Sequence, residues 1–273
     1  MKKKLIVVQY ILLIIFALVI LSPLAIVFFG AFKTPGELAN NPYSIPKEPV
    51  FNNFHEAFIR GNMLVYFKNT IFVSTVSLAI LIALSTIASY AVTRPGFKLG
   101  NKLYMYFVFG IIIPAQSIMI PTYYMMSKLR LVNNIWSLVI VYVSSCMAMS
   151  VFILSGFFRT IPSELDDAAF IDGCSEFQAF IKVILPLCKP AVTTVLILNL
   201  LFIWNDFYNP LLFIRSEEIK TIVLGLSKYM GRYLTNYPIM FAAVVMASVP
   251  VIVIFIVLQK QFVSGITAGS VKG

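Results

Sequence analysis

Residues 159–190 have the sequence RTIPSELDDAAFIDGCSEFQAFIKVILPLCKP. This stretch is amphipathic and mixed in charge, although a hydrophobic run long enough to cross a membrane lies on each side of it. Pro162 suits the first turn of a helix, and the acidic residues that follow it suit the positive end of the helix dipole. Gly173 can take the left-handed conformation that ends a helix. The pattern therefore predicts a short helix over about residues 162–173.

A second short helix is expected directly after the first. Ser175 and Gln178 have the spacing of a capping box. Pro186 and Pro190 mark the next boundary, before the chain returns to the membrane. A simple connector would not need this much specified geometry, so we expect the stretch to have a function of its own.

The composition indicates a membrane protein. The chain has 273 residues, of which 60% are hydrophobic and only 12% are charged. A soluble domain could not bury so much apolar surface, so we expect an integral membrane protein. The formal net charge of +10 comes from basic residues scattered around the hydrophobic runs. Anionic lipid headgroups are therefore the expected counterpart, and nucleic acid is not.

Six hydrophobic runs are long enough to cross the hydrocarbon core, which takes about 20 apolar residues. They cover about residues 5–30, 67–93, 103–127, 135–158, 191–214 and 238–259. Backbone groups inside lipid must pair within their own segment, so all six runs are expected to be helices and the fold to be an all-α membrane protein. Pro114 and Pro121 are expected to bend the third run.

The six spans also predict a domain organisation and an orientation. We expect a first transmembrane helix with an external loop (1–66), a core of five helices (67–262) and a C-terminal tail (263–273). An even number of spans places both termini on the same side as the central stretch. Three lysines at positions 2–4 favour the cytoplasm for that side. The prediction is a multi-pass protein of the cytoplasmic (inner) membrane with both termini cytoplasmic.

The central stretch resembles a motif of a known family. Asp167-Ala168-Ala169, then Gly173, then Val183-Ile184-Leu185-Pro186 resembles the E-A-A, G and I-x-L-P pattern of permease subunits of binding-protein-dependent ABC importers, with Asp167 in place of Glu and Val183 in place of Ile. The resemblance implies the type I ABC importer permease fold, in which this segment is the coupling helix that docks on a cytoplasmic ATPase. The docking residues that it implies here are Glu164, Leu165, Asp167, Ala168, Ala169, Asp172 and Gly173. An ordinary amphipathic cytoplasmic loop is the alternative.

The C-terminus carries a second resemblance. Residues 259–273 have the sequence QKQFVSGITAGSVKG, which by composition alone is a frayed end that is not helical past Phe262. It resembles the ending of permeases in the maltose-type, multiple-sugar group. In that group the tail reaches into the ATPase dimer, which implies a docking role for Gly269 and Lys272.

Polar residues inside the predicted spans are candidates for a substrate pathway or gate. Asp206 is the only acid deep in such a span, where an ionised carboxylate costs roughly 2.5–3.5 kcal/mol. The segment Trp204-Asn205-Asp206-Phe207 resembles the W-N-E/D-F segment of sugar-importer permeases. The candidates are Gln116, Asn199, Trp204, Asn205, Asp206 and Tyr208. Alternatively, Asn205 and Asp206 bond to neighbouring helices or cap the fifth span.

Signatures of catalysis are missing from the sequence. It contains no Walker lysine loop, HExxH, G-x-S-x-G or metal-spaced cysteine pair. We therefore expect a transport subunit and not an enzyme, with no cofactor or metal in this chain and with ATP and Mg bound by a partner. The resemblance implies a second permease subunit, two ATPase subunits and an extracytoplasmic sugar-binding protein as partners. The function that it implies is ATP-driven import of a carbohydrate, such as an oligosaccharide, across the cytoplasmic membrane. The alternatives are an importer of glycerol phosphate or another polyol derivative, and a self-contained secondary transporter or channel.

Overall fold

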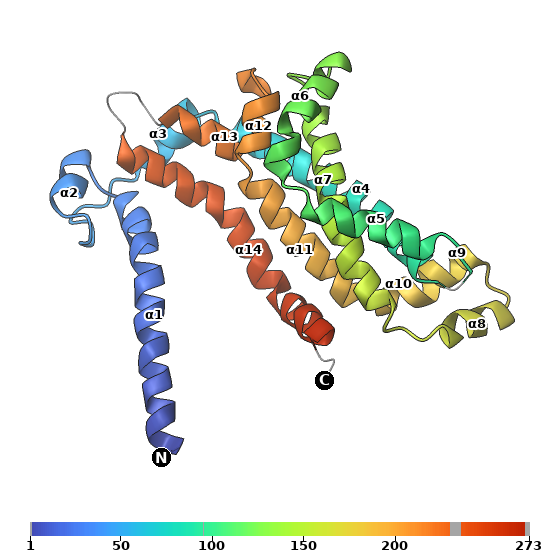
Figure 1. Ribbon diagram of the computed structural model, residues 1–273. Coiled ribbons are helices and arrows are strands. Elements are labelled where there is room, and N and C mark those ends of the chain that lie inside the picture. The colour runs from blue at the N-terminus through green and yellow to red at the C-terminus, as the bar shows by residue number, and fades with distance from the viewer. Residues whose placement is uncertain (1, 95, 230–235, 271–273) are drawn as a thin grey trace. The chain divides into compact units, whose positions relative to one another are not determined.

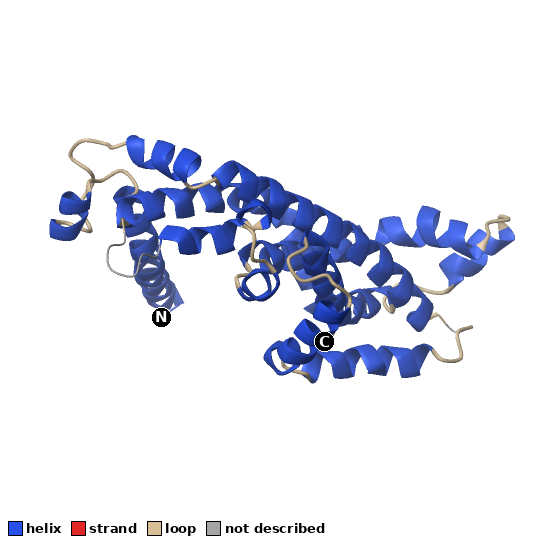
Figure 2. Cartoon of the chain, turned by 90° about the horizontal axis from the view of Figure 1, so that it is seen from above, coloured by secondary structure: helices blue, strands red, loops and turns tan. Residues whose placement is uncertain are grey.

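The computed structural model describes the backbone of residues 2–94, 96–229 and 236–270, and the side chains of residues 6–94, 96–229 and 236–260. Every regular element in these ranges is a helix, as Figure 2 shows. The chain divides into two compact units. Unit 1 consists of Met1–Phe67 and Ile222–Pro250, and unit 2 consists of Lys68–Thr221 and Val251–Gly273.

Unit 1 joins the first helices of the chain to a segment close to its end (Figure 1). Its helices are α1 (Lys2–Gly30), α2 (Pro35–Asn40), α3 (Asn52–Arg60), the start of α4 (Met63–Thr93), α13 (Ile222–Leu226), η4 (Ser227–Tyr229) and the first part of α14 (Tyr237–Ser270). The side chains of α1 are apolar around the whole helix and mostly exposed from Ile6 to Leu24. A helix that is hydrophobic all round is typical of a membrane span.

Backbone carbonyls hold the segment between α1 and α3 in place. The amide of Asn53, at the start of α3, donates to the carbonyl oxygens of Ala31 and Lys33, both at 2.9 Å. The ammonium group of Lys33 is fully buried and donates to the carbonyls of Asn41 at 2.7 Å and Pro42 at 3.2 Å. These bonds offset the cost of burying a charge, so α2 and its flanking turns pack as one ordered structure.

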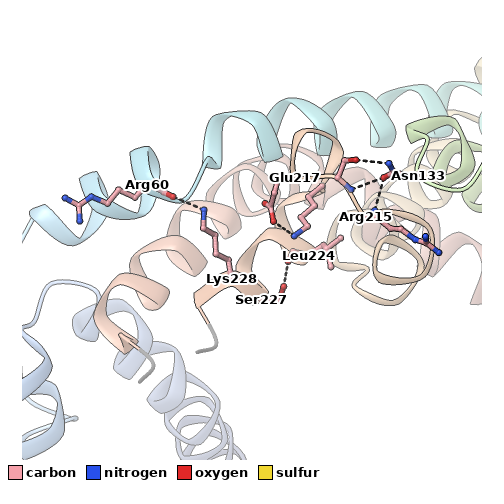
Figure 3. A network of polar contacts seen from close by, with 9 residues as sticks. Arg60, Asn133, Arg215, Glu217, Leu224, Ser227 and Lys228 are labelled. Carbon is pink, nitrogen blue, oxygen red and sulfur yellow. Dashed lines mark hydrogen bonds and ion pairs between the residues drawn. The ribbon is translucent and has the colours of Figure 1, made fainter. Parts of the chain in front are cut away.

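Polar contacts to backbone carbonyls also connect α3 and η4 within unit 1. Lys228 donates through its ammonium group to the carbonyl of Arg60 at 3.0 Å, as Figure 3 shows. The hydroxyl of Tyr229 donates to the carbonyl of Ala57 at 2.8 Å. Burial raises the pKa of the Tyr229 hydroxyl, so it stays protonated and remains a donor at neutral pH.

Replacing Gly225 by alanine is expected to destabilise unit 1. A Cβ at this position would lie 2.2 Å from a ring atom of Tyr66, which is fully buried, so the ring could move away only by displacing its neighbours. Overpacking of this kind costs about 1–3 kcal/mol, so the unfolding temperature in detergent should fall measurably. Gly36→Ala is the matched control, because no atom lies within 4 Å of a Cβ there. Equal unfolding temperatures for the two variants would show that Tyr66 can move.

Unit 2 contains most of the transmembrane helices. Its elements are the rest of α4, α5 (Gly100–Ile112), η1 (Ala115–Ile118), α6 (Met119–Lys128), α7 (Ile135–Phe158), α8 (Glu164–Ile171), α9 (Glu176–Ala179), η2 (Phe180–Ile184), α10 (Leu185–Leu187), α11 (Lys189–Asn205), α12 (Tyr208–Phe213), η3 (Glu217–Ile219) and the end of α14. Helices α5 and α11 both pack against α7. The short helices α8 to α10 lie at one end of this unit and α6 and α12 at the other (Figure 1).

An asparagine joins the start of α7 to the end of α12. Asn133 has a left-handed backbone conformation, with φ of 59°, and its backbone N–H donates to the backbone carbonyl of Phe213 at 2.7 Å. Its side-chain oxygen accepts from the backbone N–H groups of Arg215 and Ser216, both at 2.9 Å (Figure 3). These hydrogen bonds fix the turn before α7 against the turn after α12. Both turns lie at the end of unit 2 that is opposite to α8 (Figure 1).

Four helices are long and apolar enough to cross a membrane, and two bent pairs raise the number to six if each pair counts as one span. The four cover Ile6–Gly30, Met63–Thr93, Ile135–Phe158 and Tyr237–Lys260, and so confirm the first, second, fourth and sixth predicted runs with shifts at their ends. This count is made over the described residues only.

The third predicted run is a sharply bent pair of helices. Helix α5 ends at Ile112 and the following helical segment, Ala115–Lys128, is turned by 95° from it. Pro114 lies in the break, since proline cannot donate the hydrogen bond that would continue α5. Pro121 causes no second break, because it is in the first turn of α6, where proline is tolerated.

The bounds of the fifth predicted run, 191–214, are wrong. Helix α11 begins at Lys189, ends at Asn205 and is separated from α12 by an extended Asp206. It forms a bent pair with the segment Glu176–Leu187, at an angle of 76°. Hydrophobicity continues through the break, because α12 is also apolar, so composition alone did not show where the helix ends.

The expectation that the chain is not helical past Phe262 is also wrong. Helix α14 continues to Ser270. Glycine lowers helix stability by about 1 kcal/mol relative to alanine but keeps its N–H donor, so Gly265 and Gly269 do not force an end. Gly269 is therefore part of the helix by its backbone, and Lys272 lies outside the described residues.

Candidate functional site

The connector between α7 and α11 contains the predicted short helix. Helix α8 begins at Glu164, two residues later than expected, and ends at Ile171. Pro162 precedes the helix, so its predicted place in the first turn is wrong; its carbonyl accepts from the N–H of Leu165 at 3.3 Å. The acidic side chains of the first turn of α8 lie at the positive end of the helix dipole, as predicted.

Gly173 ends α8 in the predicted way. Its φ is +82°, in the left-handed region that glycine adopts without strain. The N–H of Gly173 donates to the carbonyl of Phe170 at 3.0 Å, and the N–H of Cys174 donates to the carbonyl of Ala169 at 2.9 Å. This pair of bonds is a Schellman motif, which reverses the chain directly after the helix.

The second short helix begins with the predicted capping box. The Ser175 hydroxyl accepts from the N–H of Gln178 at 3.3 Å, and the Gln178 side chain accepts from the N–H of Ser175 at 3.0 Å. A π-helical turn, η2, then turns Phe180 and Ile184 into a buried cluster with residues of α7 and α11. The second half of the connector is therefore packed against α7 and α11.

Most of the predicted docking residues are exposed to solvent. These are Glu164, Leu165, Asp167, Ala168, Asp172 and Gly173. Ala169, by contrast, is only 5% exposed and is turned toward the interior of unit 2. The two buried residues of α8, Asp166 and Ala169, are three positions apart and so lie on one side of the helix, and the other six residues are exposed.

Sequence reasoning missed the two most exposed large apolar side chains of this connector and its one buried acid. Ile171 is 86% exposed and Phe177 is 64% exposed. The position of Ile171, four residues after Asp167, was the available signal, since this spacing places it on the same face of the helix. Asp166 is only 5% exposed although it stands next to the exposed Asp167.

Asp206 organises the break between α11 and α12. The hydroxyl of Tyr142, from α7, donates to one carboxylate oxygen at 2.9 Å. The N–H of Tyr208 donates to the other oxygen at 3.0 Å, and the side-chain amide of Asn209 donates to the first at 2.7 Å. The carboxylate therefore bonds to a neighbouring helix and caps the turn into α12.

The other pathway candidates have two kinds of environment. Asn199 and Trp204 are buried, and the Asn199 amide donates to the Ser150 hydroxyl of α7 at 3.1 Å. Gln116, Asn205 and Tyr208 are exposed, and the Asn205 amide donates back to the carbonyl of Leu201 in its own helix at 2.8 Å. The buried pair thus contributes to helix packing, and the exposed three are free to face another molecule.

Known proteins are similar to this chain over nearly its whole length. It is 32% identical to the melibiose/raffinose/stachyose import permease protein MelC of Bacillus subtilis, over 92% of this chain and 91% of MelC. It is 31% identical to the multiple sugar-binding transport system permease protein MsmG of Streptococcus mutans, over 97% of this chain and 96% of MsmG.

A solved structure has the same fold. It is the crystal structure of a bacterial ABC transporter involved in the import of the acidic polysaccharide alginate. One of its chains superposes with a TM-score of 0.86 at 24% identity, covering 96% of this chain and 97% of that one. This agreement confirms the predicted all-α fold of an importer permease.

Residues 75–268 match the family described as binding-protein-dependent transport system inner membrane component. The matched range contains α8, the Schellman turn and the α11–α12 break. The chain belongs to this family, as the motif of residues 167–186 predicted.

Proposed function

We propose that this chain is one of two permease subunits of an ATP-driven importer that carries an oligosaccharide across the cytoplasmic membrane. The observation that carries the proposal is the exposed face of α8, which presents Asp167, Ala168 and Ile171 between two membrane helices. The sequence contains no Walker lysine loop, so two partner ATPases would bind ATP and Mg and dock on this face in the cytoplasm.

The chemistry of the α8 face fits a protein partner. Ala168 is small and exposed, so another backbone can approach closely, and Ile171 supplies apolar area that is 86% exposed. Asp167 adds a negative charge that would pair with a basic group of the ATPase. If α8 docks in the cytoplasm, both termini would lie there too, and an extracytoplasmic binding protein would deliver the substrate on the other side.

The substrate class is supported by the relatives and by the spans. The names of MelC and MsmG refer to sugars. In the sequences of α7 and α11 the only basic residue is Lys189, at the start of α11. A neutral sugar needs no buried cation, whereas a phosphate ester in the pathway would. The exposed amides of Gln116 and Asn205 can bond to sugar hydroxyls, and the ring of Tyr208 can stack on a sugar face.

One relative favours a second candidate substrate. The chain is 31% identical to the sulfoquinovosyl glycerol transport system permease protein SmoH of Agrobacterium fabrum. A polyol derivative is therefore the alternative cargo for the same architecture. Uptake of radiolabelled raffinose, maltotriose and glycerol 3-phosphate into proteoliposomes that contain the whole transporter separates the two, because the proposal requires uptake of one of the sugars, whereas uptake of glycerol 3-phosphate alone supports a polyol derivative.

Replacing Ala168 by tryptophan is expected to abolish co-purification of the ATPase subunits in detergent. The indole would fill the space through which the ATPase backbone approaches. Ala115→Trp is the matched control, since Ala115 is exposed in η1, on the separate helical segment that leads into α6. If Ala168→Trp retains the ATPase, the exposed face of α8 is not the docking surface. If the wild-type chain binds no ATPase and takes up a sugar alone, it is a secondary transporter.

A further inference from the structure

Two adjacent acidic residues of α8 have opposite environments. Asp167 is exposed, whereas Asp166 is 5% exposed. Neighbouring residues of a helix do not face the same way, so the two carboxylates point to different partners. The proposed docking face uses Asp167 and leaves Asp166 unexplained, and a buried carboxylate is costly unless it is paired.

One partner of Asp166, Tyr90, lies in the last turn of α4, and the other, Arg94, follows directly after α4. One carboxylate oxygen lies 2.9 Å from a guanidinium nitrogen of Arg94, as an ion pair without hydrogen-bond geometry, and the other accepts from the hydroxyl of Tyr90 at 2.7 Å. The Arg94 guanidinium also lies over the ring of Tyr90, 5.2 Å from its centroid. We call Tyr90, Arg94 and Asp166 the α8 anchor.

The α8 anchor is continuous with the core of unit 2. The ring centroid of Tyr90 lies 4.9 Å from that of Phe180 in η2 and 6.0 Å from that of Phe158 in α7. Both phenylalanines belong to the buried cluster that holds the second half of the connector. A force on Asp166 therefore reaches α4, α7 and η2 through direct contacts.

Helix α8 buries few of its own residues. It has eight residues, of which only Asp166 and Ala169 are buried. A helix this short is not stable in water on its own. Its position therefore depends on the α8 anchor at one end, and on the Schellman turn and the packing against α9 and η2 at the other.

We propose that Arg94 and Tyr90 are positioning residues that couple α8 to α4 through Asp166. This inference rests on the proposed function, because it assigns a transmission path to the site where the ATPase docks. Movement of the docked ATPase pulls α8, and the ion pair and hydrogen bond transmit that displacement to the end of a membrane-spanning helix. Pulling a buried ion pair apart leaves both charges without a partner in a buried site, so this contact opposes separation more strongly than an apolar contact of the same size.

The test uses the complete transporter in proteoliposomes, with raffinose as the probe, and compares Asp166→Asn, Arg94→Met and Tyr90→Phe with Glu176→Gln. Glu176 is an exposed acid in the first turn of α9, so this control removes the same charge from the same connector. We expect Asp166→Asn and Arg94→Met to keep the ATPase bound but to transport about 10-fold fewer raffinose molecules per ATP hydrolysed. Hydrogen exchange of the α8 amides should become faster. Tyr90→Phe, which removes one hydroxyl, should have a smaller effect in the same direction.

The double variant Arg94→Met/Asp166→Asn separates a coupled pair from two independent losses. If the residues act together, the double variant is no worse than the poorer single variant. Asp166→Glu, which keeps the charge, should recover part of the coupling. The proposal is overturned if Asp166→Asn transports normally, or if it loses the ATPase as Ala168→Trp does. Failure of the wild type to bind any ATPase would instead overturn the proposed function.

Discussion

A valine at position 173 is expected to leave the permease inserted in the membrane but to lower its coupled ATP hydrolysis. Gly173 has a φ of +82°, and a side chain in the left-handed region costs roughly 1–2 kcal/mol, more for a β-branched residue. This energy would populate alternatives to the Schellman turn about 5- to 30-fold more than in the wild type. The measurement is ATP hydrolysis stimulated by raffinose and binding protein in proteoliposomes.

Asparagine at the same position is the control for Gly173→Val. A Cβ at position 173 would meet no atom within 4 Å, so neither variant creates a clash. Asparagine tolerates the left-handed region and is found at helix ends, so Gly173→Asn should keep most of the coupled hydrolysis. Equal losses in both variants would mean that the ATPase contacts the glycine itself, and that backbone conformation is not the cause.

The sequence predicted the number and kind of elements better than their breaks. Hydrophobicity shows which segments prefer lipid, so α7 could be placed at residues 135–158 from composition alone. Hydrophobicity does not show where the backbone changes direction. The 95° turn at Pro114 was expected only as a bend. An end of the fifth span at Asp206 was raised only as an alternative, and the predicted run continued past it, because the break depends on a hydroxyl of Tyr142, on a helix distant in sequence.

The short helix shows the same division within the site. Local signals placed it to within two residues at each end: acidic residues in the first turn, a glycine after the end and a capping box directly after that. Local signals cannot say which of Asp166 and Asp167 is turned inward, since both suit the helix dipole equally. That choice is made by Arg94 and Tyr90, which precede the connector by more than sixty residues in the printed sequence. Contacts between residues far apart in the sequence, such as these, could not be predicted from any motif.

Replacing Asp206 by alanine is expected to destabilise the permease and to abolish raffinose uptake. Tyr142 is fully buried, and its hydroxyl would lose its carboxylate partner, at a cost of about 1–3 kcal/mol. The N–H of Tyr208 and the amide of Asn209 would lose the acceptor that caps α12. Thermal unfolding in detergent and uptake into proteoliposomes measure the two effects separately.

Two further variants decide whether Asp206 acts in the pathway or only in the structure. Tyr142→Phe removes the donor together with its need for a partner, and leaves the carboxylate bonded to Tyr208 and Asn209. Asp206→Asn keeps an oxygen for the N–H of Tyr208 but removes the charge. If the carboxylate only holds α12 to α7, uptake by both variants should follow their unfolding temperatures. If Asp206 forms part of the gate, Asp206→Asn should lose uptake at nearly normal stability while Tyr142→Phe keeps it. The bonds to Tyr142 and Asn209 already account for much of the acceptor capacity of this carboxylate, so we expect the first result, with the exposed Asn205 and Tyr208 left as the groups that meet the sugar.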